Sequence, residues 1–375
     1  MSTGHVLIAP DKFKGSLSAL EVATYLQDGL RAARPGLECT TAPVADGGDG
    51  TLDAAVAAGF ERIPVRVSGP TGVPVESAIA VHKGRAVVEL AAASGLVLLP
   101  EGQAAPLTAS SRGTGELINA ALDQGCAEVI LGLGGSACTD GGAGMLQALG
   151  ARLLDASGEE LSAGGAELAK LATLDVSTMD PRLARTSFVL ASDVDNPLLG
   201  PRGAAPVYAP QKGASPADVA VLESALRRWA DMVDPTSATL PGAGAAGGVG
   251  YAALTMLSAR RRPGIDVMLE LVGFAERVTG ARLVITGEGS LDAQTLHGKA
   301  PAGVAAAASS DGVAVVAVCG QQQLDDDSLA EAGIRGAYPL TDIEPDVQRC
   351  ISEPGPLLRR LAATIAQDWL PETVD

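Results

Sequence analysis

Strand-like apolar runs alternate with helical patterns along most of this chain. The clearest apolar runs are residues 5–10, 38–44, 129–134, 187–192, 282–287 and 313–318. Helical patterns lie between them, for example at residues 17–31, 116–122, 216–232 and 267–279. Strands that alternate with helices in this way lie mainly parallel in a sheet, with helices packed on its faces. The alternation therefore predicts an α/β protein with a largely parallel sheet.

One segment breaks the alternation. Residues 62–90 contain short β-rich runs separated by the turn sequences GPTG and HKGR, which is typical of antiparallel hairpins. The stretches 93–110 and 155–185 have no clear period, and we expect loops or short helices there. This part of the chain should therefore pair differently from the rest.

Composition limits the class of protein. The chain has 375 residues, enough for two domains. Its formal net charge of −17 argues against nucleic acid as a partner, because phosphate neutralisation needs a basic face. No apolar run approaches the roughly 20 residues of a membrane span, and the first residues do not resemble a signal peptide. We therefore expect a cytoplasmic protein without a membrane partner.

The five cysteines are scattered and form no CxxC pair. Neither a disulfide framework nor a zinc site is therefore indicated. Each cysteine is expected to be a small buried apolar side chain.

Glycine is concentrated in five clusters. They are residues 45–51, 111–116, 132–144, 241–250 and 286–292. Glycine permits positive φ and close backbone approach, which a phosphate-binding loop requires. One cluster, GAGAAG at 242–247, also matches the GxGxxG dinucleotide pattern, but no strand run precedes it. A nicotinamide-dependent oxidoreductase is therefore a weak alternative.

Several of the few cations lie in the same glycine-rich or turn segments, and so do several carboxylates. Backbone donors and cations can hold phosphates, carboxylates can bind Mg²⁺, and a carboxylate can accept a hydroxyl proton. These are the components of phosphoryl transfer. The candidate substrate- and phosphate-binding residues are Lys12, Gly15, Ser16, Asp46, Gly47, Gly48, Arg112, Gly134, Gly135, Ser136, Lys212, Gly287, Gly289 and Lys299.

The first strand is followed by Asp11, Lys12 and Lys14, and then by a Gly-Ser pair. Lysine gives no packing advantage at a strand end. If Gly15 and Ser16 open the following helix, their N–H groups and the helix dipole suit an anion. The alternative is a solvated turn.

Long strings of this sequence resemble the type I glycerate kinase family. They include APDKFKGSLSA, PVADGGDGT, LGLGGSACTDGGAGMLQALG, ASDVDNPLLGPRGA, YAPQKGA and LVITGEGSLDAQTLHGKAP, in order from about residue 5 to about residue 340. The departures are mild, because family members often have Glu at the position of Asp49 and Asn at that of Thr139. The resemblance implies ATP-dependent phosphorylation of D-glycerate, usually to 2-phosphoglycerate.

The resemblance also implies two α/β domains, a flavodoxin-like parallel-sheet domain and a mixed-sheet domain inserted into it. The runs at 5–10, 38–44, 282–287, 313–318 and about 335–340 would be the five strands of the first. We place residues 1–60 and 265–375 in the flavodoxin-like domain and residues 61–264 in the insert. The active site is expected in the cleft between the two domains, since α/β folds bind ligands at strand ends and domain interfaces.

The catalytic residues are predicted from their position after strands and from what phosphoryl transfer requires. Asp193 follows an apolar strand, and Asp195 lies two residues on, where an extended chain points both to one side. Asp193 is the expected base for the glycerate hydroxyl, and Glu288 is its rival. Lys14 is the expected catalytic cation, and Asp195 and Asp292 are the expected Mg²⁺ ligands.

Three questions stay open at this point. A non-catalytic sensor for a small sugar acid would also need cations for a carboxylate, although it would not need several phosphate-suited loops. The 3-hydroxyl of glycerate is an alternative acceptor to the 2-hydroxyl. A homodimer is an open option for the assembly.

Overall fold

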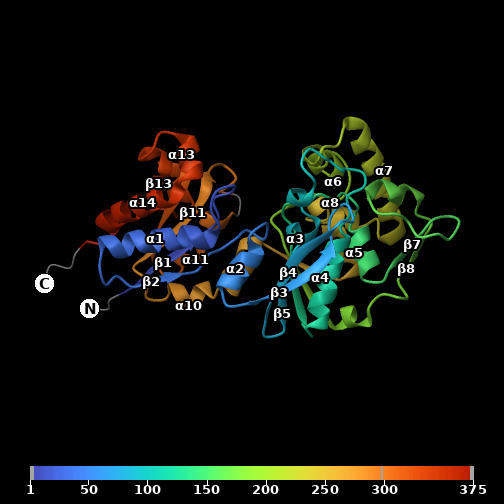
Figure 1. Cartoon of the computed structure of the whole chain (residues 1–375), viewed down its shortest axis with the longest axis horizontal. Coiled ribbons are helices and arrows are strands. Elements are labelled where there is room, and N and C mark those ends of the chain that lie inside the picture. Colours follow the sequence, from blue (N-terminus) through green and yellow to red (C-terminus); the bar gives the residue numbers. More distant parts are fainter. Residues whose placement is uncertain (1–3, 297–298, 372–375) are drawn as a thin grey trace. The chain divides into compact units, whose positions relative to one another are not determined.

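The computed structural model describes residues 4–296 and 299–371, and these fold into two compact units (Figure 1). Unit 1 takes its described residues from Met1–Asp46, Asp53–Gly59 and Ile265–Asp375. Unit 2 comprises Gly47–Leu52 and Phe60–Gly264. Within the described ranges, every helix is too short or too polar to cross a lipid bilayer.

Unit 1 is built on a five-stranded sheet. Its strands are β1 (Val6–Pro10), β2 (Cys39–Thr41), β11 (Leu283–Leu291), β12 (Ala314–Gln322) and β13 (Ala337–Pro339). They lie in the order β13-β12-β11-β1-β2, and every neighbouring pair is parallel. This is the flavodoxin-like order, in which the first strand lies between the second and the third. The parallel sheet expected from the five apolar runs is confirmed.

Helices cover both faces of this sheet. They are α1 (Ala19–Ala33), α2 (Thr51–Ala57, whose first two residues belong to unit 2), α9 (Gly264–Leu271, whose first residue belongs to unit 2), α10 (Phe274–Val278), α11 (Ala300–Ser309), α12 (Asp326–Glu331), α13 (Val347–Ser352) and α14 (Pro354–Trp369). Val6 and Ile8 of β1 pack with α1 and α14, whereas Leu7 packs with α9 to α11 on the opposite face. Figure 1 shows α1 and α14, from opposite ends of the chain, lying side by side.

The helix predicted at 267–279 is divided into α9 and α10. Gly273 adopts a left-handed conformation with φ of 62° immediately before α10. That conformation interrupts the helical hydrogen bonding, and glycine adopts it without steric penalty. The apolar period alone did not reveal this break.

Unit 2 is built on a six-stranded mixed sheet. Its strands are β3 (Glu61–Ser68), β4 (Pro74–His82), β5 (Arg85–Glu89), β6 (Glu128–Gly132), β9 (Ser187–Ala191) and β10 (Arg260–Arg262), in the order β10-β9-β6-β5-β4-β3. The pairs β3–β4 and β4–β5 are antiparallel, and the other pairs are parallel. The predicted hairpins are therefore confirmed. The sequence did not suggest β10, because its three arginines have no apolar pattern.

The remaining elements of unit 2 surround a core that contains Trp229, Tyr251, Leu117 and Met145, all fully buried. The helices are α3 (Ala91–Ser94), α4 (Arg112–Asp123), α5 (Ala143–Ala148), α6 (Ala204–Tyr208), α7 (Pro216–Val233) and α8 (Ala245–Met256). A small hairpin pairs β7 (Arg152–Leu154) with β8 (Thr173–Asp175). β8 lies in the stretch 155–185 where we expected loops or short helices; three residues are too few to show a period.

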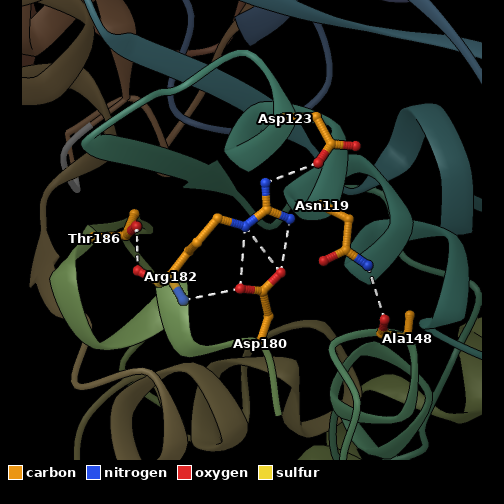
Figure 2. A network of polar contacts seen from close by, with 6 residues as sticks. All are labelled: Asn119, Asp123, Ala148, Asp180, Arg182 and Thr186. Carbon is orange, nitrogen blue, oxygen red and sulfur yellow. Dashed lines mark hydrogen bonds and ion pairs between the residues drawn. The ribbon is translucent and has the colours of Figure 1, made fainter.

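Short 3-10 helices complete the chain at Leu96–Leu98, Gly165–Lys170, Pro181–Arg185, Pro210–Lys212, Ser237–Thr239 and Leu340–Asp342. Arg182, in the third of these, joins it to α4 (Figure 2). Its guanidinium lies 2.8 Å from Asp123 Oδ1 and 2.7 Å from Asp180 Oδ2. The three side chains form a polar network on the surface of unit 2.

Candidate active site

The carboxyl end of the unit 1 sheet gathers acidic side chains from three strands. Asp11 follows β1, Asp46 lies beyond β2, and Glu288 belongs to β11. The Asp11 N–H donates to Gly287 O at 2.8 Å, which fixes the ends of β1 and β11 against each other. Strand order reverses between these two strands, and α/β sheets of this type bind ligands at such a point.

Glu288 is held by two groups from the segment that follows β11. The residue is 7% exposed. Thr295 Oγ1 donates to Glu288 Oε1 at 2.5 Å, and Lys299 Nζ lies 3.7 Å from Glu288 Oε2. Burial raises the pKa of Glu288, Thr295 and Lys299 partly offset that rise, and the charges of Asp292 and Asp46 add to it. A carboxylate in this setting accepts a proton near neutral pH more readily than an exposed one.

Asp11 is a member of this cluster that the sequence-based list of site residues did not include. Burial raises its pKa to about 8, and the neighbouring charge of Asp46 adds to the rise. The Lys12 N–H donates to Asp11 Oδ1 at 2.6 Å, which acts in the opposite direction. Its position just after a buried parallel strand, the same signal that singled out Asp193, could have identified it.

The turn that follows Asp11 differs from the sequence-based expectation. Helix α1 begins after Ser18, whose hydroxyl accepts from the Glu21 N–H while the Glu21 carboxylate accepts from the Ser18 N–H. The Ser16 N–H donates to Phe13 O at 2.8 Å, and Gly15 has a φ of 77°. Gly15 and Ser16 therefore precede the helix rather than open it, because Ser18 and Glu21 supply the cap. Lys14 and Gly15 are exposed at the tip of this turn.

Two glycines of β11 lie at the same sheet end, and one of them allows a close backbone approach. A Cβ on Gly287 would lie 2.4 Å from Val318 O, and one on Gly289 would lie 3.5 Å from Lys14 N. Only glycine fits the first position without displacing β12. The second places β11 beside the lysine turn.

Asp292 forms a turn after β11. Its Oδ1 accepts from the Gln294 N–H at 2.8 Å, and its own N–H donates to Thr295 Oγ1 at 3.0 Å. Thr295 is thus bound to both Asp292 and Glu288. Unit 1 brings together, among the predicted site residues, Lys12, Lys14, Asp46, Gly287, Glu288, Gly289, Asp292 and Lys299.

In unit 2 the glycine-rich loop 47–50 lies against strand ends. A Cβ on Gly47 would lie 2.9 Å from Ala191 O at the end of β9, and one on Gly134 would lie 2.5 Å from Gly48 Cα. These approaches need residues without a Cβ. The buried carboxylate of Glu89 holds the loop, because its Oε2 accepts from the N–H groups of Gly50 at 3.2 Å and Leu52 at 3.0 Å.

Asp193 and Asp195 follow β9, and both are exposed. Asp193 Oδ1 accepts from the Gly264 N–H at 3.0 Å. Asp195 Oδ1 lies 2.5 Å from Nη2 of Arg261, in the neighbouring strand β10. The unexpected strand β10 therefore supplies the cation next to Asp195.

Lys212 is buried, and its ammonium group donates hydrogen bonds to the glycine-rich segment after β6. Nζ donates to Ser136 Oγ at 2.9 Å and to Cys138 O at 2.5 Å, and the residue is 3% exposed. Burial lowers its pKa. Arg112 is different: it is exposed and pairs with Glu116 at 3.2 Å. Gly135, in the same segment, has a φ of 70° that favours glycine.

Asp140 is fully enclosed by donors. Its Oδ2 accepts from the Ser111 N–H at 2.7 Å and from Ser111 Oγ at 2.8 Å, and its two oxygens also accept from the N–H groups of Gly142 and Gly144. Two glycines of the cluster at 132–144, Gly142 and Gly144, therefore donate their N–H groups to a buried carboxylate of the same unit.

The GAGAAG match does not have the context of a dinucleotide site. A 3-10 helix, Ser237–Thr239, precedes it instead of a strand, and Ala246 to Gly248 have positive φ inside α8. No observation in this region supports the oxidoreductase alternative.

Metal ligands are not preassembled in the described part of the chain. Across residues 4–296 and 299–371, no group of three or more His, Cys, Asp or Glu side chains is arranged to hold a metal ion. Asp195 and Asp292, the predicted ligands, each already contact a donor of their own unit.

Comparisons with known proteins agree with the family resemblance. Residues 6–370 match the model of the glycerate kinase family. The chain is 48% identical to a glycerate kinase of Bacillus subtilis (strain 168) over 351 residues, which cover 90% of this chain and 92% of the relative. It is 43% identical to a glycerate 2-kinase of Escherichia coli (strain K12), with coverage of 89% and 90%. A crystal structure of a candidate glycerate kinase 2 from Salmonella typhimurium LT2 is similar, with a TM-score of 0.83, 40% identity and coverage of 98% and 99%. This chain belongs to the glycerate kinase family.

Proposed function

We propose that this phosphotransferase moves the γ-phosphoryl group of ATP to the 2-hydroxyl of D-glycerate, giving 2-phosphoglycerate and ADP. Membership of the family carries the glycerate kinase activity and its use of ATP. The name glycerate 2-kinase, borne by the Escherichia coli relative, supports the 2-hydroxyl over the 3-hydroxyl.

The buried, hydrogen-bonded carboxylate of Glu288 is the observation that carries the assignment of the base. A glycerate hydroxyl is weakly acidic, so its proton must leave as the bond to phosphorus forms. Burial raises the pKa of Glu288, and Lys299 at 3.7 Å favours its ionised form. Asp193 is exposed in its unit and remains the second candidate. We place Glu288 first.

Anion binding is assigned to the lysine turn and to the glycine-rich segments. Lys14 is exposed beside Gly289, and Lys12 is close enough to Asp11 to lower its pKa. These lysines would bind the glycerate carboxylate or the transferring phosphate. Gly47, Gly48, Gly134 and Gly135 would present backbone donors to the nucleotide phosphates. Ser136 follows Gly135 directly, and the exposed Arg112 would add a cation. Lys212 would contribute indirectly, by fixing the segment of Ser136 and Cys138 through its hydrogen bonds.

Mg²⁺ is proposed as the ion that accompanies ATP, with Asp195 and Asp292 as its protein ligands. Carboxylate oxygens are suitable donors for Mg²⁺, which usually binds one or two carboxylates together with substrate phosphates. When bound, the ion would neutralise charge that develops on the phosphoryl oxygens. That strand-end residues of both units form one active site stays a prediction from the sequence. A homodimer also stays a prediction.

Product identification tests the acceptor. Phosphorus NMR of a reaction with D-glycerate and ATP separates 2-phosphoglycerate from 3-phosphoglycerate, and we expect the former. Accumulation of the 3-isomer would reject the 2-hydroxyl assignment while leaving the kinase activity intact.

Paired substitutions test the base. Glu288→Gln and Asp193→Asn each keep size and remove basicity. We expect kcat of Glu288→Gln to fall by roughly 10²–10⁴ with ATP binding preserved, and a smaller loss for Asp193→Asn. The reverse ranking would return the role to Asp193.

A further inference from the structure

Thr295 is a buried threonine whose hydroxyl is committed to the carboxylate of Glu288. Its exposed fraction is 0%. Oγ1 donates to Glu288 Oε1 at 2.5 Å and accepts from the Asp292 N–H at 3.0 Å. Because a hydroxyl has one proton, the bond from Asp292 leaves that proton directed at Glu288.

The backbone of Thr295 is fixed as well. Its N–H donates to Asp292 O at 2.9 Å, so the turn after β11 is closed at both its backbone and its side chain. A β-branched side chain also has few χ1 conformations. The donor therefore stands at a defined place beside Oε1, while Lys299 Nζ lies on the side of Oε2.

We propose that Thr295 is a positioning residue for phosphoryl transfer, acting by holding the carboxylate of Glu288 in the orientation that accepts the substrate proton. The proposal rests on the role given to Glu288 above. A base must lie within hydrogen-bond reach of the proton that it removes, so the rotation of its carboxylate matters as much as its position. Thr295 fixes that rotation from one oxygen and leaves the other oxygen to the side of Lys299.

The chain contains a matched control. Thr286, on the same strand as Glu288, is also 0% exposed, and its Oγ1 donates to Ala9 O at 2.9 Å. Thr286→Val removes a buried threonine hydroxyl from the same sheet without removing a contact to Glu288. It therefore reports what the loss of such a hydroxyl does to unit 1 alone.

The experiment compares Thr295→Val, Thr295→Ser and Thr286→Val in steady-state kinetics with D-glycerate and ATP. We expect Thr295→Val to lower kcat by roughly 10- to 100-fold, the range for a lost hydrogen bond to a charged group, with both KM values within about twofold. Thr295→Ser, which keeps the hydroxyl, should recover kcat to within about threefold. Thr286→Val should keep kcat within about twofold.

Three results would overturn the proposal. They are an unchanged kcat in Thr295→Val, an equal loss in Thr286→Val, and no recovery in Thr295→Ser. Thermal unfolding of each variant shows whether the fold is intact. Glu288→Gln separates this failure from that of the proposed function: if it loses activity while Thr295→Val keeps it, only the positioning role is rejected, whereas full activity of Glu288→Gln rejects the base itself.

Discussion

Charged side chains of the two units meet different partners. In unit 2, Glu89, Asp140 and Lys212 are buried and bonded to the backbone and hydroxyl groups of glycine-rich loops. In unit 1, Glu288 and Asp11 lie among other charges, and burial raises the pKa of each. The first arrangement holds loops in place, whereas the second leaves carboxyl groups whose pKa values lie above their ordinary range.

The two tryptophans allow each unit to be followed separately. Trp229 is buried in the core of unit 2 and donates to Gly141 O at 3.0 Å. Trp369 belongs to unit 1 and donates to the Tyr338 hydroxyl at 2.9 Å. A Trp369→Phe background leaves Trp229 as the fluorescence probe of unit 2, and Trp229→Phe leaves Trp369 as the probe of unit 1.

The largest effect is expected from Asp140→Ala. It removes a buried carboxylate and leaves the donors of Ser111, Gly142 and Gly144 without their acceptor. Buried unsatisfied donors are costly, so the free energy of unfolding of unit 2 should fall by about 3–5 kcal/mol. Urea unfolding followed through Trp229 measures it. Asp155→Ala is the control, because the Asp155 carboxylate also accepts from two N–H groups, those of Ser157 and Glu159, but in solvent-exposed hydrogen bonds. An equally small effect of both substitutions would mean that the buried network does not stabilise unit 2.

Lys14→Ala tests the proposed anion site of unit 1. Lys14 is exposed, so the fold should be kept. A charge-assisted contact to substrate is worth about 1.5–3 kcal/mol, so kcat/KM should fall by more than about tenfold. Initial rates of ADP release measure it, and Lys170→Ala, an exposed lysine of unit 2, is the control. Near wild-type kinetics would identify Lys14 as a solvated surface charge.

Asp11→Asn tests the raised pKa in unit 1. Between the ordinary pKa near 4 and the folded value of about 8, the folded unit keeps a proton on Asp11 that the unfolded chain has released. The free energy of unfolding must therefore fall as pH rises through this range. Asp11→Asn removes this part of the fall, and one pKa unit corresponds to about 1.4 kcal/mol.

The measurement is urea unfolding at pH 5 and pH 8, followed through Trp369. The raised pKa of Glu288 contributes a fall of the same sign, so the variant should show a shallower pH dependence rather than none. An unchanged dependence would remove Asp11 from the set of shifted groups.

The smallest effect is expected from Arg182→Ala. Figure 2 shows its ion pairs with Asp123 and Asp180, whose side chains stay 66% and 20% exposed beside a 39% exposed Arg182, so water partly screens them. The free energy of unfolding of unit 2, followed through Trp229, should fall by at most about 1 kcal/mol. A loss as large as that of Asp140→Ala would erase the distinction between buried and exposed charges in unit 2.

The sequence predicted the strands better than the side-chain partners. Apolar runs located four strands of unit 1, and the family resemblance added the fifth at about 335–340. Short β-rich runs and turn sequences located the hairpins of unit 2. These patterns missed β10, which pairs with β9 through its backbone although its side chains are arginines. They also missed the division of the helix at Gly273, which depends on one φ angle.

For the candidate site, the local sequence identified charged residues in glycine-rich segments. It did not show which of them are buried in contacts within their own unit. Lys212 and Asp140 lie in glycine-rich or turn segments as Lys299 and Asp292 do, yet they are buried in contacts within unit 2. Thr295 was absent from the predicted site residues, because its significance comes from its contact with Glu288, which only the fold creates. Asp11 follows a buried strand as Asp193 does and could have been included, but its raised pKa depends on burial and on Asp46. Long-range proximity of this kind is not written in a local pattern.

The split of unit 1 along the chain has a consequence for folding in time. β1 is an interior strand of its sheet, yet its neighbour β11 lies far along the chain, and Thr286 and Ala9, which bond to each other, are 277 residues apart. At synthesis rates of about 5–20 residues per second, β1 waits roughly 15–55 s for that partner. Most of unit 2 lies between them and can fold during the wait. We expect the first strand to be an exposed apolar segment throughout this interval, and hence a point where a newly made chain needs protection from aggregation.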